Sequence, residues 1–304
     1  MTIEYAVVQA KHKPWGSSML LPWSHTPANG DPIGELWFAR TDAAAPESAL
    51  LLKLLFTTEP LSIQIHPDDA MARSIDLANG KTEAWYILSA TPDARVAVGL
   101  KRPLSPTDLR SAISDGSIAD LVQWHPVSKG EAIFVPAGTI HSIGAGIVLA
   151  EIQQRSDATF RLFDYGRRRE LHIDNAVAAA RAAPERQSPP EKLSAARSAL
   201  VISRYFVLEQ IDLLPDSVWT LTSLAEIWIL VIEGHAQFGS TDVSVGHAVF
   251  LEADHAEIQA GADGMKALLA YPGPHVNSGV LCEQHRTVPE QPLLETQEAQ
   301  TWSL

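Results

Sequence analysis

The stretch "GEAIFVPAGTIH", from Gly130 to His141, has the spacing of a strand, a tight turn and a second strand. Gly130 makes the turn into a strand of apolar residues. Pro136 and Gly138 suit the following turn, where glycine permits a positive φ. The pattern therefore predicts two neighbouring strands, with His141 at the start of the second.

Most of the chain has a similar character, with short β-branched and aromatic runs separated by Gly, Pro and Asp. Two patches are expected to be helical: "SPTDLRSAISDGSIADLVQW", and an Ala-rich stretch from "DNAVAAARAA" through "PPEKLSAARSAL". Many short strands with helices gathered in insertions favour double-sheet barrels over a parallel α/β fold. We therefore expect a mainly β protein.

The two halves of the chain resemble each other. A Glu-x-Trp run begins at Glu83 in the first half and at Glu226 in the second, and each precedes a Gly-led segment that ends in a histidine, His141 or His255. This order predicts two copies of one β unit. The expected domains are residues 1–185, with a helical insertion at about 105–124, and residues 186–304.

Composition restricts the possible partners. The 304 residues carry a formal net charge of −13, which argues against a nucleic-acid partner. Cys282 is the only cysteine, so no intramolecular disulfide forms, as suits a reducing compartment. The N-terminus lacks a secretion-signal pattern, and the apolar runs are too short to span a membrane. We expect a cytoplasmic protein with no membrane partner.

The stretch "SIQIHPDD", from Ser62 to Asp69, raises the question of a metal site. Read as a strand, it places Gln64 and His66 on one face. Pro67 ends the strand, and the two aspartates that follow are expected in a turn. Taken alone, this pair is either half of a metal site or the polar face of an ordinary strand.

A family resemblance connects these stretches. The spacing G-x5-P-x-G-x2-H at Gly130–His141 resembles the second motif of cupins, jelly-roll barrels that hold a metal inside. Gln64-Ile-His66, in place of the usual His-x-His, resembles type I mannose-6-phosphate isomerases. "KPWG", "GELWF", "GKTEAWYIL" and "VPAGTIHSIGAGIVLAEIQQRSDATFRLFDYGR" follow in that family's order. Without the long helical insertion of larger members, the chain resembles the short bacterial form.

The resemblance implies a fold of two cupin-type barrels, the second degenerate and metal-free. It also implies one zinc ion per chain, and mixed nitrogen and oxygen ligation suits a catalytic zinc. The implied zinc ligands are Gln64, His66, Glu83 and His141. The implied catalytic residues are Arg161, which alternation places opposite the core-facing Phe160 and Leu162, and the cavity residues Lys81 and Glu151.

The implied reaction interconverts mannose 6-phosphate and fructose 6-phosphate through a cis-enediol, in a monomer or weak homo-oligomer. The proton-transfer base stays open between Lys81 with a lowered pKa, Glu151 with a raised pKa, and a zinc-bound water. Two alternatives are an Fe(II) cupin dioxygenase, against which Gln64 argues, and a non-catalytic or regulatory sugar-binding cupin.

Overall fold

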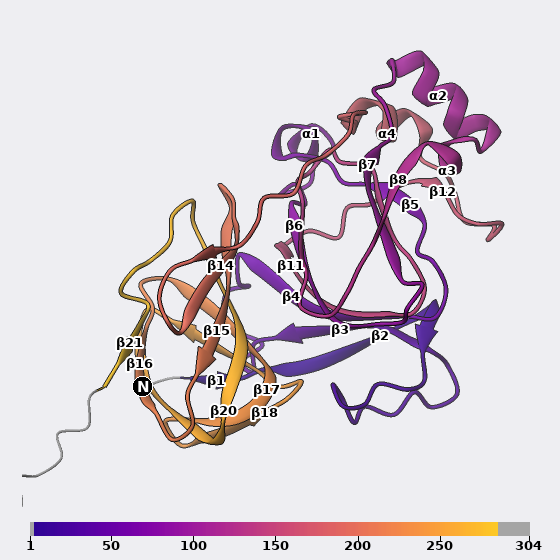
Figure 1. Ribbon diagram of the computed structural model, residues 1–304. Helices are drawn as coiled ribbons and strands as arrows, with labels where there is room; N and C mark the ends of the chain where they lie inside the picture. Colours follow the sequence, from indigo (N-terminus) through magenta and orange to yellow (C-terminus); the bar gives the residue numbers. More distant parts are fainter. Residues whose placement is uncertain (1–2, 285–304) are drawn as a thin grey trace, which may run out of the picture.

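Antiparallel sheets are the dominant regular structure of the protein, as a computed structural model that describes residues 3–284 shows (Figure 1). Two sheets face each other in the first half of the chain, and a third, ten-stranded sheet forms the second half. The expected mainly β architecture is therefore confirmed. Within the described residues, no helix is long and apolar enough to cross a membrane.

The first half is a barrel made from a six-stranded and a five-stranded sheet. Apolar side chains of both sheets, such as Ile87 and Val98, fill part of the space between them. The six-stranded sheet runs in the order β2 (Val7–Ser17), β3 (Ile33–Ala39), β4 (Leu50–Thr57), β11 (Ile147–Gln154), β6 (Glu83–Ala90) and β9 (Ala132–Val135). The five-stranded sheet runs in the order β12 (Phe160–Phe163), β5 (Ile63–Ile65), β10 (His141–Ile143), β7 (Arg95–Leu100) and β8 (Val122–Pro126).

The helices lie with the five-stranded sheet, at the upper right in Figure 1. Ile63 and Ile65 of β5 are fully buried in a cluster with apolar side chains of these helices, such as Leu109 and Ile113. Because side chains alternate along a strand, Gln64 faces the other way, toward the barrel interior. The helices are α1 (Asp69–Ser74), α2 (Pro106–Asp115), α3 (Ile118–Leu121) and α4 (Ile173–Ala179).

The ten-stranded sheet also takes in the start of the chain, because Glu4 of β1 pairs with Phe250 of β19. The predicted second domain extends to residue 304, and its residues 285–304 lie outside the described part. The predicted boundary at residue 185 stays a prediction. The strands of this sheet are β1 (Glu4–Tyr5), β13 (Glu191–Lys192), β14 (Arg197–Ile202), β15 (Phe206–Leu213), β16 (Val218–Thr222), β17 (Glu226–Phe238), β18 (Thr241–Ser244), β19 (Ala248–Glu252), β20 (His255–Pro272) and β21 (Leu281–Glu283).

One apolar core joins the two halves. Leu54 and Ala84 of the six-stranded sheet are in the same buried cluster as Trp228 and Phe250 of the ten-stranded sheet. Full burial of a large apolar side chain contributes about 1.5–3 kcal/mol. The outer face of the first barrel is therefore a packed contact with the second half.

The helix predictions are right in part. Ser105 caps α2, which begins at Pro106 and ends at Asp115, before Gly116 with a φ of 81°. From Val122 onward, however, the chain forms strand β8. The Ala-rich patch is helical only in α4, and its second part forms β13 and β14, where pairing with β15 outweighs helix propensity.

The expectation of a turn at Asp68 and Asp69 is wrong. Asp68 caps helix α1, and its carboxylate accepts a hydrogen bond of 2.9 Å from the Met71 N–H. Asp69 is the first helical residue, and its carboxylate accepts from the Gly80 N–H. A short helix therefore follows the strand that carries Gln64.

Candidate metal centre

The strand pairing brings three distant segments together inside the first barrel. His141 at the start of β10 pairs directly with Gln64 of β5, so this pairing joins the two sequence motifs. Gly138 has a φ of 86° in the turn before it, and the Thr139 N–H donates to the Pro136 carbonyl, which confirms the predicted tight turn. Glu83 begins β6 in the six-stranded sheet.

His66, Glu83 and His141 form a buried cluster whose ligand atoms all lie within 4.8 Å of one another. Nε2 of His66 lies 3.3 Å from Oε2 of Glu83, and Nε2 of His141 lies 3.5 Å from Oε1. Nε2 of His66 and Oε2 of Glu83 make no hydrogen bond within the described residues, although Nζ of Lys81 forms an ion pair with that Oε2. Buried polar atoms are normally satisfied, so this convergence fits a site for a cation.

The outer nitrogens of both imidazoles are held by the backbone. Nδ1 of His66 lies 2.7 Å from the Ala158 carbonyl oxygen, and Nδ1 of His141 lies 2.9 Å from that of Thr139. A carbonyl only accepts, so both Nδ1 atoms donate and both Nε2 atoms present a lone pair toward Glu83. Burial lowers the pKa of His66 to about 3 and also lowers that of His141. Neutral imidazole is the metal-binding form.

Gln64 lies beside this cluster, but its amide oxygen faces away from it. Its Nε2 is 3.3 Å from Nε2 of His141, while its Oε1 accepts a 3.0 Å hydrogen bond from the Ser62 hydroxyl. The oxygen is the atom that would bind a cation. The assignment of Gln64 as a fourth ligand therefore stays a prediction.

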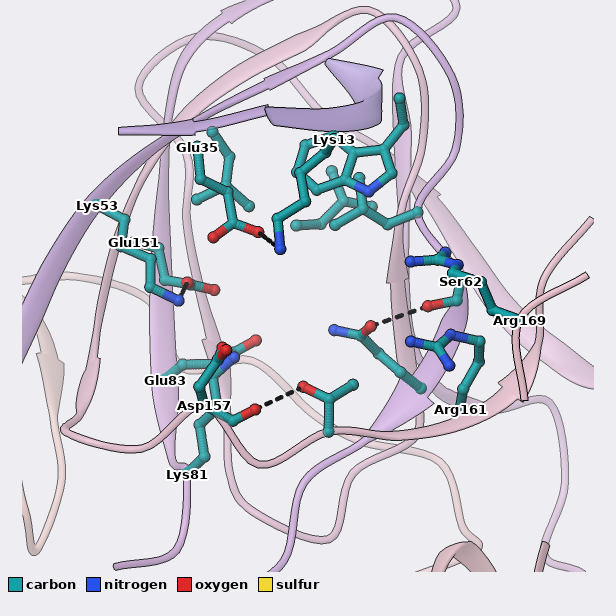
Figure 2. Close-up of a pocket in the computed structure, with 16 residues that line it drawn as sticks. Lys13, Glu35, Lys53, Ser62, Lys81, Glu83, Glu151, Asp157, Arg161 and Arg169 are labelled. Carbon is teal, nitrogen blue, oxygen red and sulfur yellow. Dashed lines mark hydrogen bonds and ion pairs between the residues drawn. The ribbon is translucent and has the colours of Figure 1, made fainter. Parts of the chain in front are cut away.

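A cavity of about 260 Å³ reaches the cluster at Glu83, and charged side chains line it (Figure 2). Of the residues predicted for the site, the lining includes Gln64, Lys81, Glu83, Glu151 and Arg161. The sequence reasoning did not assign Lys13, Glu35, Lys53, Asp157 or Arg169 to it. Lys53 is the single charged residue in the apolar run "LLLKLLF", and this was the sequence feature that could have indicated a buried functional lysine.

Glu151 is held in a network of buried groups. Its Oε2 lies 3.2 Å from Nζ of Lys53, its direct partner in the β4–β11 ladder. Its Oε1 accepts a 3.2 Å hydrogen bond from Nε1 of Trp85, which also donates to Oε1 of Glu83 at 3.1 Å. Burial, and then the charge of Glu83, raises the pKa of Glu151 to about 7. This carboxyl is therefore poised to exchange a proton near neutrality.

Lys81 differs from the expectation of a lowered pKa. Burial alone would lower the pKa of Lys81, but the charges of Glu83 and Glu151 raise it above the usual lysine value. Nζ of Lys81 is 3.3 Å from Oε2 of Glu83. In this arrangement Lys81 is a cation, whereas a neutral lysine is the form that could act as a base.

Arg161 faces the cavity, as the alternation of β12 predicts. Phe160 and Leu162 are buried in the cluster that packs on the helices, while Arg161 is on the other face. Its Nη1 donates to the Glu170 carbonyl at 2.8 Å, and its buried Nε has no partner among the described residues.

The second half places its Glu-x-Trp run in a different environment. Trp228 packs in the core between the halves, whereas Trp85 packs inside the first barrel. Glu226 accepts hydrogen bonds from the N–H groups of Ala49 and Leu50, at 2.6 and 2.8 Å. The His255 side chain is 64% exposed. The Glu-x-Trp run of the second half therefore turns Glu226 and Trp228 toward the contact between the halves.

Together, the fold and the site define a two-barrel β protein of the cupin type, with a His–Glu–His centre inside its first barrel. No family model matches the chain. It is 37% identical over 158 residues to mannose-6-phosphate isomerase of Streptococcus mutans, and 38% identical over 135 residues to mannose-6-phosphate isomerase ManA of Bacillus subtilis. These matches cover 49% and 42% of this chain. The chain spans about half the length of the curated relatives it matches, 50% and 42% respectively.

The likeness of the folds extends further. The crystal structure of the mannose 6-phosphate isomerase from Bacillus subtilis superposes with a TM-score of 0.75 at 25% identity, covering 89% of this chain and 99% of that one. A mutant phosphomannose isomerase from Salmonella typhimurium superposes with a TM-score of 0.72 at 16% identity, covering 90% and 100%, and shows the fold alone. The resemblance to mannose-6-phosphate isomerases is confirmed in sequence over about half the chain and in fold over most of it.

Proposed function

We propose that the protein is a metal-dependent aldose–ketose isomerase that interconverts mannose 6-phosphate and fructose 6-phosphate. The observation that carries this proposal is the buried cluster of His66, Glu83 and His141, whose ligand atoms converge beside a cavity of acids and bases. The named relatives support the choice of substrate. In this proposal the first barrel, within residues 1–185, carries the reaction.

The residues at the centre fit a zinc ion. The Nε2 atoms of His66 and His141 and the carboxylate of Glu83 would hold it, and rotation of the Gln64 amide about its last torsion would add Oε1. Nitrogen and oxygen donors without thiolate are typical of catalytic zinc. When bound, zinc polarises the sugar carbonyl and stabilises negative charge on its oxygen.

Glu151 is the group that we assign to proton transfer. Isomerisation moves one proton from C2 to C1 and a second proton from O2 to O1. A single base on one side of the cis-enediol suffices for the transfer between the two carbons. A carboxyl with a pKa of about 7 takes up and releases a proton readily near neutrality. Lys53 and Trp85 hold the two carboxylate oxygens and thereby fix their direction.

Two cations complete the site. Lys81 stays protonated beside Glu83 and donates to an oxygen of the substrate. Arg161 directs its remaining N–H donors into the cavity and supplies positive charge to the anionic substrate and enediolate. Both groups are fixed before the substrate binds, which limits reorganisation during the reaction.

A coupled assay tests the proposal. The purified full chain, with its metal content measured, is given mannose 6-phosphate, glucose 6-phosphate or mannose. We expect conversion of mannose 6-phosphate that a chelator abolishes and zinc restores. A zinc-replete protein without conversion would refute the isomerase proposal. Binding of the sugar phosphate without turnover would favour a sugar-binding protein instead.

A further inference from the structure

Two arginines at the cavity differ from its three lysines in how they are paired. Lys13, Lys53 and Lys81 each lie within 3.4 Å of a carboxylate that lines the same cavity. Arg161 forms no ion pair within residues 3–284, and the partner of Arg169, Asp164, is not among the lining residues. Figure 2 shows both arginines on the wall opposite Glu151. The lysines are neutralised within the cavity, and the arginines are not.

Asp164 fixes the position of Arg169. Its carboxylate is buried, with 4% of the residue exposed, and accepts from Nε and Nη2 of Arg169 at 2.8 and 2.5 Å. Nε of Arg167 also donates to Asp164 at 3.1 Å, and Nη2 of Arg167 donates to the Pro60 carbonyl. One buried carboxylate therefore holds two guanidinium groups, and the bidentate pair sets the orientation of Arg169.

Both arginines keep hydrogen-bond donors for a ligand. A guanidinium carries five N–H groups, of which Arg169 uses two on Asp164 and Arg161 uses one on the Glu170 carbonyl. Burial, and then the positive charge of Arg169, lowers the pKa of Arg161, so the two groups lie close enough to repel each other. An anion bound between them would remove that repulsion.

We propose that Arg161 and Arg169 form the subsite for the phosphate group of the substrate, and that Asp164 is its positioning residue. The identity of the substrate as a sugar phosphate rests on the function proposed above. A phosphomonoester carries about −1.5 to −2 charges at pH 7 and three acceptor oxygens, which suits two guanidinium groups. In a chain with a net charge of −13, such an anion needs a local cationic site. Arg169 is then the residue that distinguishes phosphorylated from neutral sugar.

The test is a ratio of affinities measured by calorimetry on the metal-loaded full chain. Fructose 6-phosphate and fructose are the probes, and the ratio of their dissociation constants reports on the phosphate alone. We expect Arg169→Gln to reduce the preference for the phosphorylated sugar about 10- to 100-fold, as loss of a charge-assisted hydrogen bond does. Arg169→Lys keeps the charge but lacks the planar, bidentate guanidinium. Its ratio of dissociation constants should therefore lie between those of the wild type and Arg169→Gln.

Asp164→Asn should change the same ratio in the same direction, by a smaller factor, because the asparagine oxygen still accepts one bond. Arg168→Gln is the matched control, since Arg168 is exposed and absent from the described lining, and it should leave the ratio unchanged. An unchanged ratio in Arg169→Gln, or equal weakening of both sugars, would overturn the subsite. Selective binding without isomerisation would refute the proposed reaction and leave the subsite standing.

Discussion

Glu83 and Glu226 each open a Glu-x-Trp run, yet Glu83 faces the inside of its barrel and Glu226 faces the contact between the two halves. In β17 the alternate residues, such as Ile227 and Ile229, fill the apolar core of the second half. The same local pattern therefore supplies a candidate metal ligand, Glu83, in the first half. In the second half it supplies Glu226, a hydrogen-bond acceptor for backbone N–H groups of the first half. The roles of Glu83 and Glu226 differ because the two runs place opposite faces of their strands toward the interior of their own half, although the motif is the same.

Replacing His66 by Ala should remove the metal and the activity together. The variant lacks the Nε2 that converges on Glu83, and the remaining donors are too few for tight binding. Metal content after dialysis and turnover of mannose 6-phosphate are the two readouts. His125→Ala, at an exposed position on β8, is the control and should keep both. Full activity in a metal-free His66→Ala protein would contradict the ligand assignment.

Replacing Arg161 by Ala should leave the metal bound but slow turnover. Arg161 lines the cavity without contributing to the His–Glu–His cluster, so metal content should match the wild type. Loss of a preorganised donor to developing charge typically costs about 100- to 1,000-fold in kcat. Steady-state kinetics with metal analysis on the same sample measures both. An unchanged kcat would remove Arg161 from the proposed mechanism.

Replacing Lys53 by Met should move the pH profile to higher pH. The charge of Lys53 lowers the pKa of Glu151, opposing burial, so its loss raises that pKa above about 7. A base acts only when deprotonated, so the rising limb of kcat/KM should shift upward by about one pH unit.

The measurement is the pH dependence of kcat/KM for the Lys53→Met variant, compared with that of the wild type. Lys129→Met, which removes an exposed pair with Glu233, is the control and should leave the limb in place. A limb at the wild-type position in Lys53→Met would argue that Glu151 is not the base.

Replacing Glu226 by Ala should destabilise the protein without releasing the metal. The N–H groups of Ala49 and Leu50 would lose their acceptor at the contact between the halves, and an unsatisfied buried donor costs about 1–3 kcal/mol. Denaturant unfolding measures the loss. Glu252→Ala removes a carboxylate whose side chain is 47% exposed, and should cost less. Metal loss at unchanged stability would instead place Glu226 in the metal site.

Much of the candidate site follows from local patterns. The alternation of β5 and β12 correctly predicts the faces of Gln64 and Arg161, and the turn at Gly138 delivers His141 to the start of a strand. The Ala-rich segment shows the limit of this reasoning. Its composition favours a helix, but β14 pairs with β15 along most of its length, and that pairing depends on residues outside the segment.

The sequence by itself determined the turns, the alternation and the order of the metal-type residues, because these depend on neighbours along the chain. Only the tertiary structure decided which face of each Glu-x-Trp run entered a barrel. It also decided that Lys53 meets Glu151, since that contact comes from the ladder between β4 and β11. Register between distant strands is set by the packing of both faces at once, and no single segment contains that information.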